Sequence, residues 1–380
     1  MSVLRPRPPT DPIEHEPPRG ALSDGGRPDP RWRAWLERGE EVRGAVASSC
    51  GRATEAMLEA YGTTRSPARR RDSVLFGILD HARRVRESVD RVVVIGDRAD
   101  RCLVDLLLST CCHPRHDDLP RHERGGRPRI WTLSPDDDDD TVQGIVDALA
   151  PRSGDRLLDA WGVLAAGPCH EAFTQDCLRL FAAGVEAPDR VDLAALQGSG
   201  DERCGPVPVQ DEASGGVFTA AALLPAAIAG IDVVRLLEGA AAMARRFREA
   251  PAEANPVVSL AIVGRWLAQP HCRPEGSPRR SIVPPPRWRG LVEWLASRSV
   301  PPLPGAPPML DVCFRTPIAV AECRRDPFAS SPRTAPLRSP QEGVATGAAD
   351  RLLLPRCDEH TVGQLLEGLR LAAAVEAALG

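Results

Sequence analysis

The stretch before residue 97 predicts a helix that leads into a buried strand. Apolar side chains recur three or four residues apart, at helical spacing: Ile78, Ala82, Val85 and Val89. The next five residues, 91–95, are mostly β-branched, and Gly96 follows them. A short apolar run of this kind that ends at a glycine is typical of a strand inside a sheet.

A second unit of strand and helix comes next. Residues 130–133 have strand character, and the five aspartates 136–140 precede a helical pattern. The apolar positions of that pattern are Val142, Ile145, Val146 and Leu149. Further apolar runs at 157–165 and 191–196 flank a helical stretch around 173–181. This alternation predicts an α/β fold with a mostly parallel sheet that helices cover on both faces.

Helices dominate the second half of the chain. Residues 206–216 are rich in turn residues, and helical patterns follow at 218–229 and 233–247. The Asn-Pro pair at 255–256 predicts another helix start, because asparagine caps a helix well and proline suits the first helical position. An Ala- and Leu-rich helical pattern closes the chain from Thr361 to Leu379.

The length of 380 residues is more than one ordinary hydrophobic core holds, since domains average about 150 residues. Residues 1–30 carry Pro, Arg, Gly and Asp without periodicity, which predicts a disordered leader. We expect a first domain over residues 31–205 and a second over residues 206–380. Within the second, the Pro- and Arg-rich stretches near 270–287 and 324–345 predict loops.

Composition limits the chemistry and the partners. All 48 basic side chains are arginines, so a lysine Schiff base and a phosphate-binding lysine are excluded. The net charge is −4 and the only dense basic run, 69–71, meets an aspartate at once, so we expect no nucleic-acid partner. Eleven cysteines and the absence of a signal-peptide pattern favour free thiols in a reducing cytoplasm. The longest apolar runs are too short to span a membrane, so we expect no membrane partner either.

A central run carries a family resemblance. It reads GGVFT at residues 215–219, LLPAAIAGID at 223–232 and LLEGA at 236–240. This run resembles the central signature of the glucose-6-phosphate isomerases, in which a Gly-Gly-Arg-Phe-Ser turn leads into a Leu-Pro-Ala-Ala helix. The segment 130–149 and the run DEHTVGQLL at 358–366 resemble other family segments in the same order.

The resemblance implies two sugar-isomerase domains, each a flavodoxin-like sandwich of parallel strands between helices. It also implies a role in carbohydrate metabolism, a sugar phosphate as ligand, a homodimer, and no metal or other cofactor. Isomerisation of a sugar phosphate needs an anion cradle, a carboxylate that moves a proton, and a cation that stabilises the enediolate.

The residues at the matching positions depart from these requirements. The first family phosphate loop, Gly-x-Gly-Gly-Ser, corresponds to residues 96–100, which read GDRAD. Only Gly96 matches there, and the two acids repel a dianion unless Arg98 or Arg101 compensates. The second loop, rich in hydroxyls in the family, corresponds to residues 165–171, which read AAGPCHE. Val217 takes the place of the family arginine.

The proton-transferring groups depart as well. Ala296, after Trp294, takes the place of the catalytic glutamate, and Glu293 lies three residues upstream. No counterpart of the ring-opening histidine is found between residues 303 and 351. The candidate catalytic residues are therefore Glu293 and His170, and the candidate ligand-binding residues are Gly96, Arg98, Gly215, Gly216 and Ser297.

Three functional hypotheses remain open. The first is a non-catalytic relative with a degenerate site and a sugar-phosphate-binding or assembly role. The second is a divergent but active glucose-6-phosphate isomerase of glycolysis and gluconeogenesis that uses relocated groups such as Glu293, Arg98 or His170. The third is a sugar-phosphate sensor without turnover.

Two other segments have the composition of metal sites. The run CCHPRHD at 111–117 holds zinc-ligand types, but no second pair follows at usable spacing. The carboxylates of 136–140 fan outward from a helix start, which favours a solvated cap over a cation site. We therefore expect no metal ion.

The adjacent Cys169 and His170 point to opposite faces of an extended chain, which favours a structural loop over a nucleophile.

Overall fold

The computed structural model describes residues 12–17, 23–24, 27–28, 30–51, 54, 58–59, 61, 73–151, 153–165, 171–184, 190–193, 217–267, 281–285, 288, 290–297, 309–314, 350–355 and 357–379. The chain divides into two compact units. Unit 1 comprises Met1–Arg52, Glu238–Pro285 and Pro302–Gly380, and unit 2 comprises Ala53–Leu237 and Pro286–Pro301. The predicted domain boundary between residues 205 and 206, and most of the two predicted loops, lie outside the described residues.

Unit 2 contains a sheet of four parallel strands in the order β5-β4-β6-β7. The strands are β4 (Arg91–Ile95), β5 (Arg129–Leu133), β6 (Trp161–Ala165) and β7 (Arg190–Leu193). The helices are α4 (Val74–Ser88), α5 (Arg98–Cys111), α6 (Asp139–Leu149), α7 (Arg156–Asp159), α8 (Glu171–Gly184), α9 (Ala220–Ala229) and α12 (Gly290–Ser297). The chain starts this sheet at β4, adds β5 on one side and then β6 and β7 on the other.

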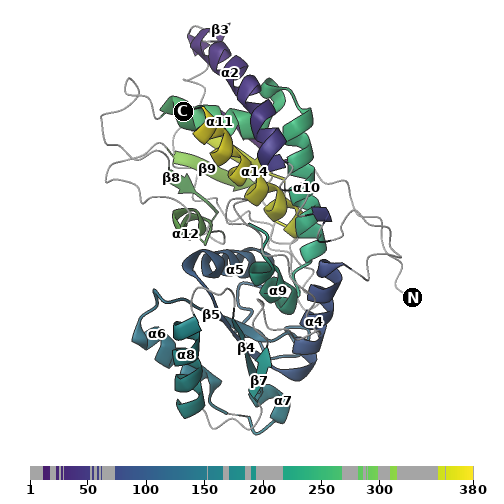
Figure 1. Ribbon diagram of the computed structural model, residues 1–380, viewed down its shortest axis with the longest axis vertical. Helices are drawn as coiled ribbons and strands as arrows, with labels where there is room; N and C mark the ends of the chain where they lie inside the picture. Colours follow the sequence, from purple (N-terminus) through teal and green to yellow (C-terminus); the bar gives the residue numbers. More distant parts are fainter. Residues whose placement is uncertain are drawn as a thin grey trace, which may run out of the picture. The chain divides into compact units, whose positions relative to one another are not determined.

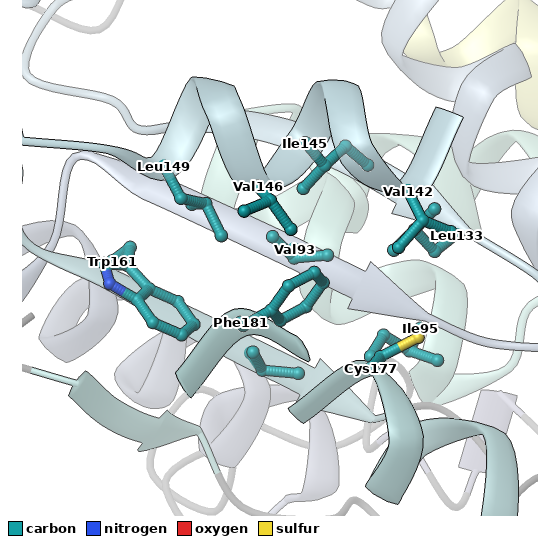
Figure 2. Close-up of a cluster of buried hydrophobic side chains, with 11 residues drawn as sticks. Val93, Ile95, Leu133, Val142, Ile145, Val146, Leu149, Trp161, Cys177 and Phe181 are labelled. Carbon is teal, nitrogen blue, oxygen red and sulfur yellow. The ribbon is translucent and has the colours of Figure 1, made fainter. Parts of the chain in front are cut away.

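One face of this sheet is covered by α6 and α8 (Figure 2). The cluster contains Val93, Ile95, Leu133, Val142, Ile145, Val146, Leu149, Trp161, Val163, Cys177 and Phe181. The rings of Trp161 and Phe181 meet edge to face with centroids 5.9 Å apart, a favoured aromatic geometry. Val92 and Val94 point to the opposite face because side chains alternate along a strand, and they are buried too. Strand β4 is therefore covered on both faces.

Unit 1 contains a second sheet, with strand order β1-β10-β9-β8. Its strands are β1 (Glu14–Glu16), β8 (Ser281–Val283), β9 (Met309–Phe314) and β10 (Asp350–Leu354). Strands β8, β9 and β10 are parallel, and β1 pairs with β10 in the antiparallel direction. Two further short strands, β2 (Ser23–Asp24) and β3 (Arg27–Pro28), pair with each other.

The helices of unit 1 are α2 (Pro30–Val46), its π-helical extension η1 (Ala47–Gly51), the 3-10 turn η4 (Ala252–Ala254), α11 (Pro256–Leu267) and α14 (Glu359–Ala378). Helix α10 (Val233–Glu249) belongs to this unit from Glu238 onward. Helices α2, α11 and α14 pack against one another (Figure 1). None of the helices in the described ranges combines the length and the apolar character needed to cross a bilayer.

The expected mixed α/β class with parallel strands and a large helical share is confirmed. The expected disordered leader is wrong for residues 12–17, which form β1 and its flanks. Ile13 is 1% exposed, and its backbone N–H donates to Gln364 Oε1 at 3.4 Å. The leader lacks periodicity because a three-residue edge strand is too short to show one; a partner strand distant in sequence, β10, stabilises it.

Helices α10 and α14 approach so closely that only glycine fits at their contact. A Cβ atom at Gly239 would lie 2.0 Å from the backbone oxygen of His360. The side chain of His360 is buried, and its Nδ1 lies 3.0 Å from Gln364 Nε2, the amide that donates to it. Since backbone and buried ring leave no room, the two helices must separate if Gly239 gains a methyl group.

We expect Gly239→Ala to lower the free energy of unfolding by roughly 1–3 kcal/mol, the usual cost of overpacking. The matched control is Gly44→Ala in α2, where an added Cβ meets nothing within 4 Å. That control should stabilise the protein by roughly 0.5–1 kcal/mol, because alanine loses less backbone entropy in a helix. Urea unfolding followed by circular dichroism measures both, and equal effects of the two changes would contradict the close contact.

Candidate functional site

The candidate site lies at the carboxyl edge of the sheet in unit 2. Strands β4 and β6 are neighbours in this sheet. After β4 the chain adds β5 on one side of it and then β6 on the other side, so the strand order reverses at β4. Open parallel sheets bind ligands outside the carboxyl ends of their strands at such a switch point. Gly96 follows β4 directly, and its N–H donates to the Leu133 carbonyl of β5 at 3.0 Å. The residues after β6, including His170, lie outside the described part of the chain, as do Gly215 and Gly216.

Helix α5 starts at this edge, and its own N-cap occupies its N-terminus. The carboxylate of Asp97 accepts a hydrogen bond of 2.7 Å from the backbone N–H of Asp100. The first N–H groups of a helix are unpaired and carry partial positive charge, which is why phosphates bind at such positions. Here an intramolecular carboxylate takes that role, and Arg98 extends from the first helical position with its side chain exposed.

A second helix N-terminus in unit 2 is linked to the first. Thr219 caps α9 by accepting from the backbone N–H of Ala222 at 3.3 Å. Its hydroxyl also donates to Asp100 Oδ1 at 3.4 Å. The preceding residue, Phe218, has its carbonyl bound by the Tyr61 hydroxyl at 2.7 Å, and burial raises the pKa of Tyr61. Both helix starts are therefore capped by a side chain of the chain itself.

Val217, at the position of the family arginine, is 3% exposed. Its apolar side chain belongs to the buried interior of unit 2. A cationic group in the same place would lose its hydration, so this position packs and offers no charge.

Arg101, three residues after Arg98 on α5, interacts with carboxylates. The Arg101 guanidinium pairs with Asp137 and lies 3.6 Å from Asp105. Asp105 also accepts a hydrogen bond of 2.8 Å from the Thr132 hydroxyl of β5. Burial raises the pKa of Asp105, and the nearby Glu293 adds to that effect, while Thr132 and Arg101 oppose it.

The structure places Glu293 beside the middle of α5. Helix α12 begins in close contact with α5, since a Cβ at Gly290 would lie 3.2 Å from Leu106 Cα. The charge of Glu293 raises the pKa of both Asp105 and Cys102, although burial is the larger cause for each. Asp105 lies seven residues beyond Arg98, or about 10 Å along the helix axis.

Glu293 is thus grouped with Asp105 and Cys102, whereas Gly96 and Arg98 lie together at the start of α5. Ser297 ends α12, and its side chain lies outside the described part of the chain. The roles of all these residues stay predictions. Asp105 is not among the candidates predicted from the sequence, although the sequence carries a signal for it: a carboxylate inside the apolar run LVDLLL, four residues after Arg101.

The segments with metal-site composition have local partners. In the first, His113 Nδ1 accepts from the backbone N–H of Arg115 at 3.1 Å, and His116 Nε2 lies 3.2 Å from the Pro128 carbonyl. In the second, the Asp138 carboxylate caps α6 through the Thr141 N–H at 2.8 Å. Across the residues that are described, no three His, Cys, Asp or Glu side chains come close enough to hold a metal ion.

Comparisons with known proteins give matches in structure alone. No protein-family model and no curated protein matches the sequence. A hypothetical protein from Thermus thermophilus has a TM-score of 0.56 at 14% identity, over 97% of this chain and 94% of that one. A glucose-6-phosphate isomerase from Chlamydia trachomatis has a TM-score of 0.54 at 14% identity, over 93% of this chain and 82% of that one. In its fold, this chain resembles a glucose-6-phosphate isomerase.

The structural likeness agrees with the resemblance that the motifs at 215–240 indicate. At 14% identity it establishes a shared fold and carries no information about activity. The chemistry of this chain therefore depends on its own side chains.

Asp105 provides a pH-dependent prediction. Its raised pKa means that the folded state binds the proton more tightly than the unfolded state, whose carboxyl titrates near 3.9. The free energy of unfolding contributed by Asp105 should therefore fall as the pH rises from about 4 through the raised pKa. Asp105→Asn keeps an acceptor for the Thr132 hydroxyl and should make the free energy of unfolding less dependent on pH. At pH 7 the free energy of unfolding of this variant should differ from that of the unchanged protein by less than about 1 kcal/mol.

Thr132→Val is the opposite control for this prediction. It removes the hydroxyl that donates to the Asp105 carboxylate, so the pKa of Asp105 should rise further and the fall with pH should steepen. Urea unfolding at a series of pH values measures both variants. A steeper fall in Asp105→Asn than in the unchanged protein would contradict the assignment.

Proposed function

We propose that this chain is a glucose-6-phosphate-isomerase-like protein of carbohydrate metabolism whose catalytic site has degenerated, and that it acts by binding or assembly without turnover. Two sugar-isomerase domains and a homodimer are part of the same proposal. What supports them is the shared fold, together with a sheet that contains parallel strands in each of the two units.

The observation that carries the proposal is the carboxylate cap on α5. In a sugar-phosphate isomerase the loop after the first strand has to receive a phosphate dianion. Here Asp97 fills the helix N-terminus and Asp100 lies beside it, bound to Thr219. A dianion in that position would be within a few ångströms of two negative charges. Two unit charges of like sign about 4 Å apart repel by about 4 kcal/mol near a protein surface, and a dianion is repelled about twice as strongly by each carboxylate.

The cations that could offset this repulsion are few. Arg101 is already paired with Asp137 and lies beside Asp105. Arg98 is exposed, so solvent screens its charge. Val217 supplies no charge where the family has arginine. This pattern favours an assembly role over the binding of a sugar phosphate.

The direct test is an isomerase assay on the purified full chain with glucose 6-phosphate and with fructose 6-phosphate. We expect turnover below roughly 0.001 per second, because typical enzymes reach about 1–1,000 per second and the acid–base and cationic groups are replaced. Interconversion at an enzyme-like rate would overturn the proposal and favour the active-isomerase alternative.

A second test asks whether the Asp97 carboxylate is what excludes anions. Asp97→Ser keeps a good N-cap but removes the charge, so the helix N-terminus becomes available to an anion. The unchanged protein should show no thermal shift with millimolar fructose 6-phosphate. The melting temperature of the variant should rise by about 2 °C with the ligand, which corresponds to a ligand concentration several times its Kd.

Asp138→Ser at the start of α6 is the matched control, because Asp138 caps its helix in the same manner as Asp97. It should show no ligand-dependent shift, since it lies at an exposed helix start. A shift of equal size in both variants would indicate general anion binding and contradict a site at α5. A clear shift in the unchanged protein would instead support a sugar-phosphate sensor.

A further inference from the structure

A groove of about 1000 Å³ lies within unit 1, and the proposed function makes no use of it. Its walls are strand β1, the first half of α2, and the segment from η4 to the start of α11. Ligand sites commonly have volumes of about 300–1,000 Å³, so this groove lies at the upper end of that range.

Strand β1 is fixed as one wall of the groove by side chains from other elements. His15 Nδ1 lies 2.8 Å from Ser259 Oγ of α11. The backbone of Ile13 is bound by Gln364 at its N–H and by the Arg246 guanidinium at its carbonyl. These contacts hold the acidic side chains that flank His15, Glu14 and Glu16, at the edge of the groove.

The inside of the groove is partly apolar. Trp32 lies at the base of α2, 8% exposed, and Leu36 follows one turn later on the same side of the helix. The segment from η4 to the start of α11 adds Pro251, Ala252 and Pro256. An indole face within reach of a ligand attracts cations as well as apolar groups.

The charged groups around the groove are mostly acidic. Five glutamates line it, against two arginines and His15: Glu14, Glu16, Glu37, Glu40 and Glu253, with Arg33 and Arg246. Two of these groups, Glu40 and Arg246, already have partners within the protein. The guanidinium of Arg43 pairs with Glu40, which also accepts from the Ala252 N–H at 3.1 Å, and Arg246 is bound to backbone carbonyls.

Two of the glutamates that line the groove lie on helical elements with their side chains exposed. Glu37 on α2 and Glu253 on η4 are exposed, and neither forms an ion pair with any residue in the described ranges. They line the groove from two different elements. A ligand in the groove therefore meets negative charge from α2 and from η4, together with an apolar surface that includes Trp32.

We propose that this groove binds a basic, partly apolar linear peptide segment of a partner protein. Arginine or lysine side chains of the peptide pair with Glu37 and Glu253, and its apolar side chains cover Trp32 and Leu36. Nucleic acids and sugar phosphates are disfavoured because their phosphates would meet the glutamates. The groove is larger than a simple amine needs, and its polar and apolar walls match a chain in which both kinds of side chain alternate.

The test measures fluorescence anisotropy of a labelled peptide that alternates Arg and Leu, with the purified full chain at low salt. We expect saturable binding that the double variant Glu37→Gln/Glu253→Gln weakens roughly five- to tenfold, the effect of losing two partly exposed charge pairs. Circular dichroism confirms that the variant is folded.

The matched control is Glu41→Gln, on the same helix α2 and exposed, but outside the lining of the groove. It should leave the affinity unchanged, which separates this site from general attraction to a protein of net charge −4. Equal weakening by Glu41→Gln, equal binding of a peptide with Glu in place of Arg, or no saturable binding would each overturn the proposal. Equal affinity for a simple diamine would overturn the assignment to a peptide. The isomerase assay is independent of all these results.

Discussion

The structure of unit 2 depends on the burial of strand β4 on both faces. Val92 and Val93 are fully buried and Val94 nearly so, which requires apolar cover from helices above and below the strand. A strand so covered can extend its sheet only sideways, with β5 on one side and β6 on the other, both parallel to it. The chain must then leave β4 at Gly96 and turn into α5, so the start of α5 is fixed at the carboxyl edge.

The charges of unit 2 are distributed unevenly around this sheet. At the amino edge, the buried carboxylate of Asp90 is bound by three arginines at 2.8–2.9 Å: Arg121, Arg124 and Arg129. Arg91 donates to the last carbonyls of α6 and pairs with Asp159. In a chain without lysine, guanidinium groups provide these bonds, since their planar fork can bind several acceptors at once. The carboxyl edge receives Asp97 and Asp100 instead, which is the reverse of what a phosphate site requires.

A fold and a phosphate site depend on different features of a sequence. The fold persists at 14% identity to a glucose-6-phosphate isomerase because it depends on apolar periodicity, which many sequences satisfy. A phosphate site depends on particular donors in a particular loop, and the loop after β4 matches the isomerase pattern Gly-x-Gly-Gly-Ser only at Gly96. A shared fold does not by itself imply a shared activity.

By itself, the sequence determined the elements whose apolar positions repeat. The helix before β4, the strand itself, the helix after the aspartates and the Asn-Pro helix start all appear as α4, β4, α6 and α11. These are local properties, because spacing and capping act within a few residues. The sequence also predicted that Asp97 and Asp100, next to Gly96, disfavour a phosphate at that loop, and this remains a prediction.

Only the tertiary structure decided the contacts between distant segments. Strand β1 forms because β10, more than 330 residues later, offers its edge, and Gly239 is needed because His360 lies against it. The pairing of Thr219 with Asp100, and the position of Glu293 beside Asp105, likewise join residues more than 100 positions apart. No local pattern encodes such contacts, since they depend on how whole helices and sheets pack once their apolar faces are buried.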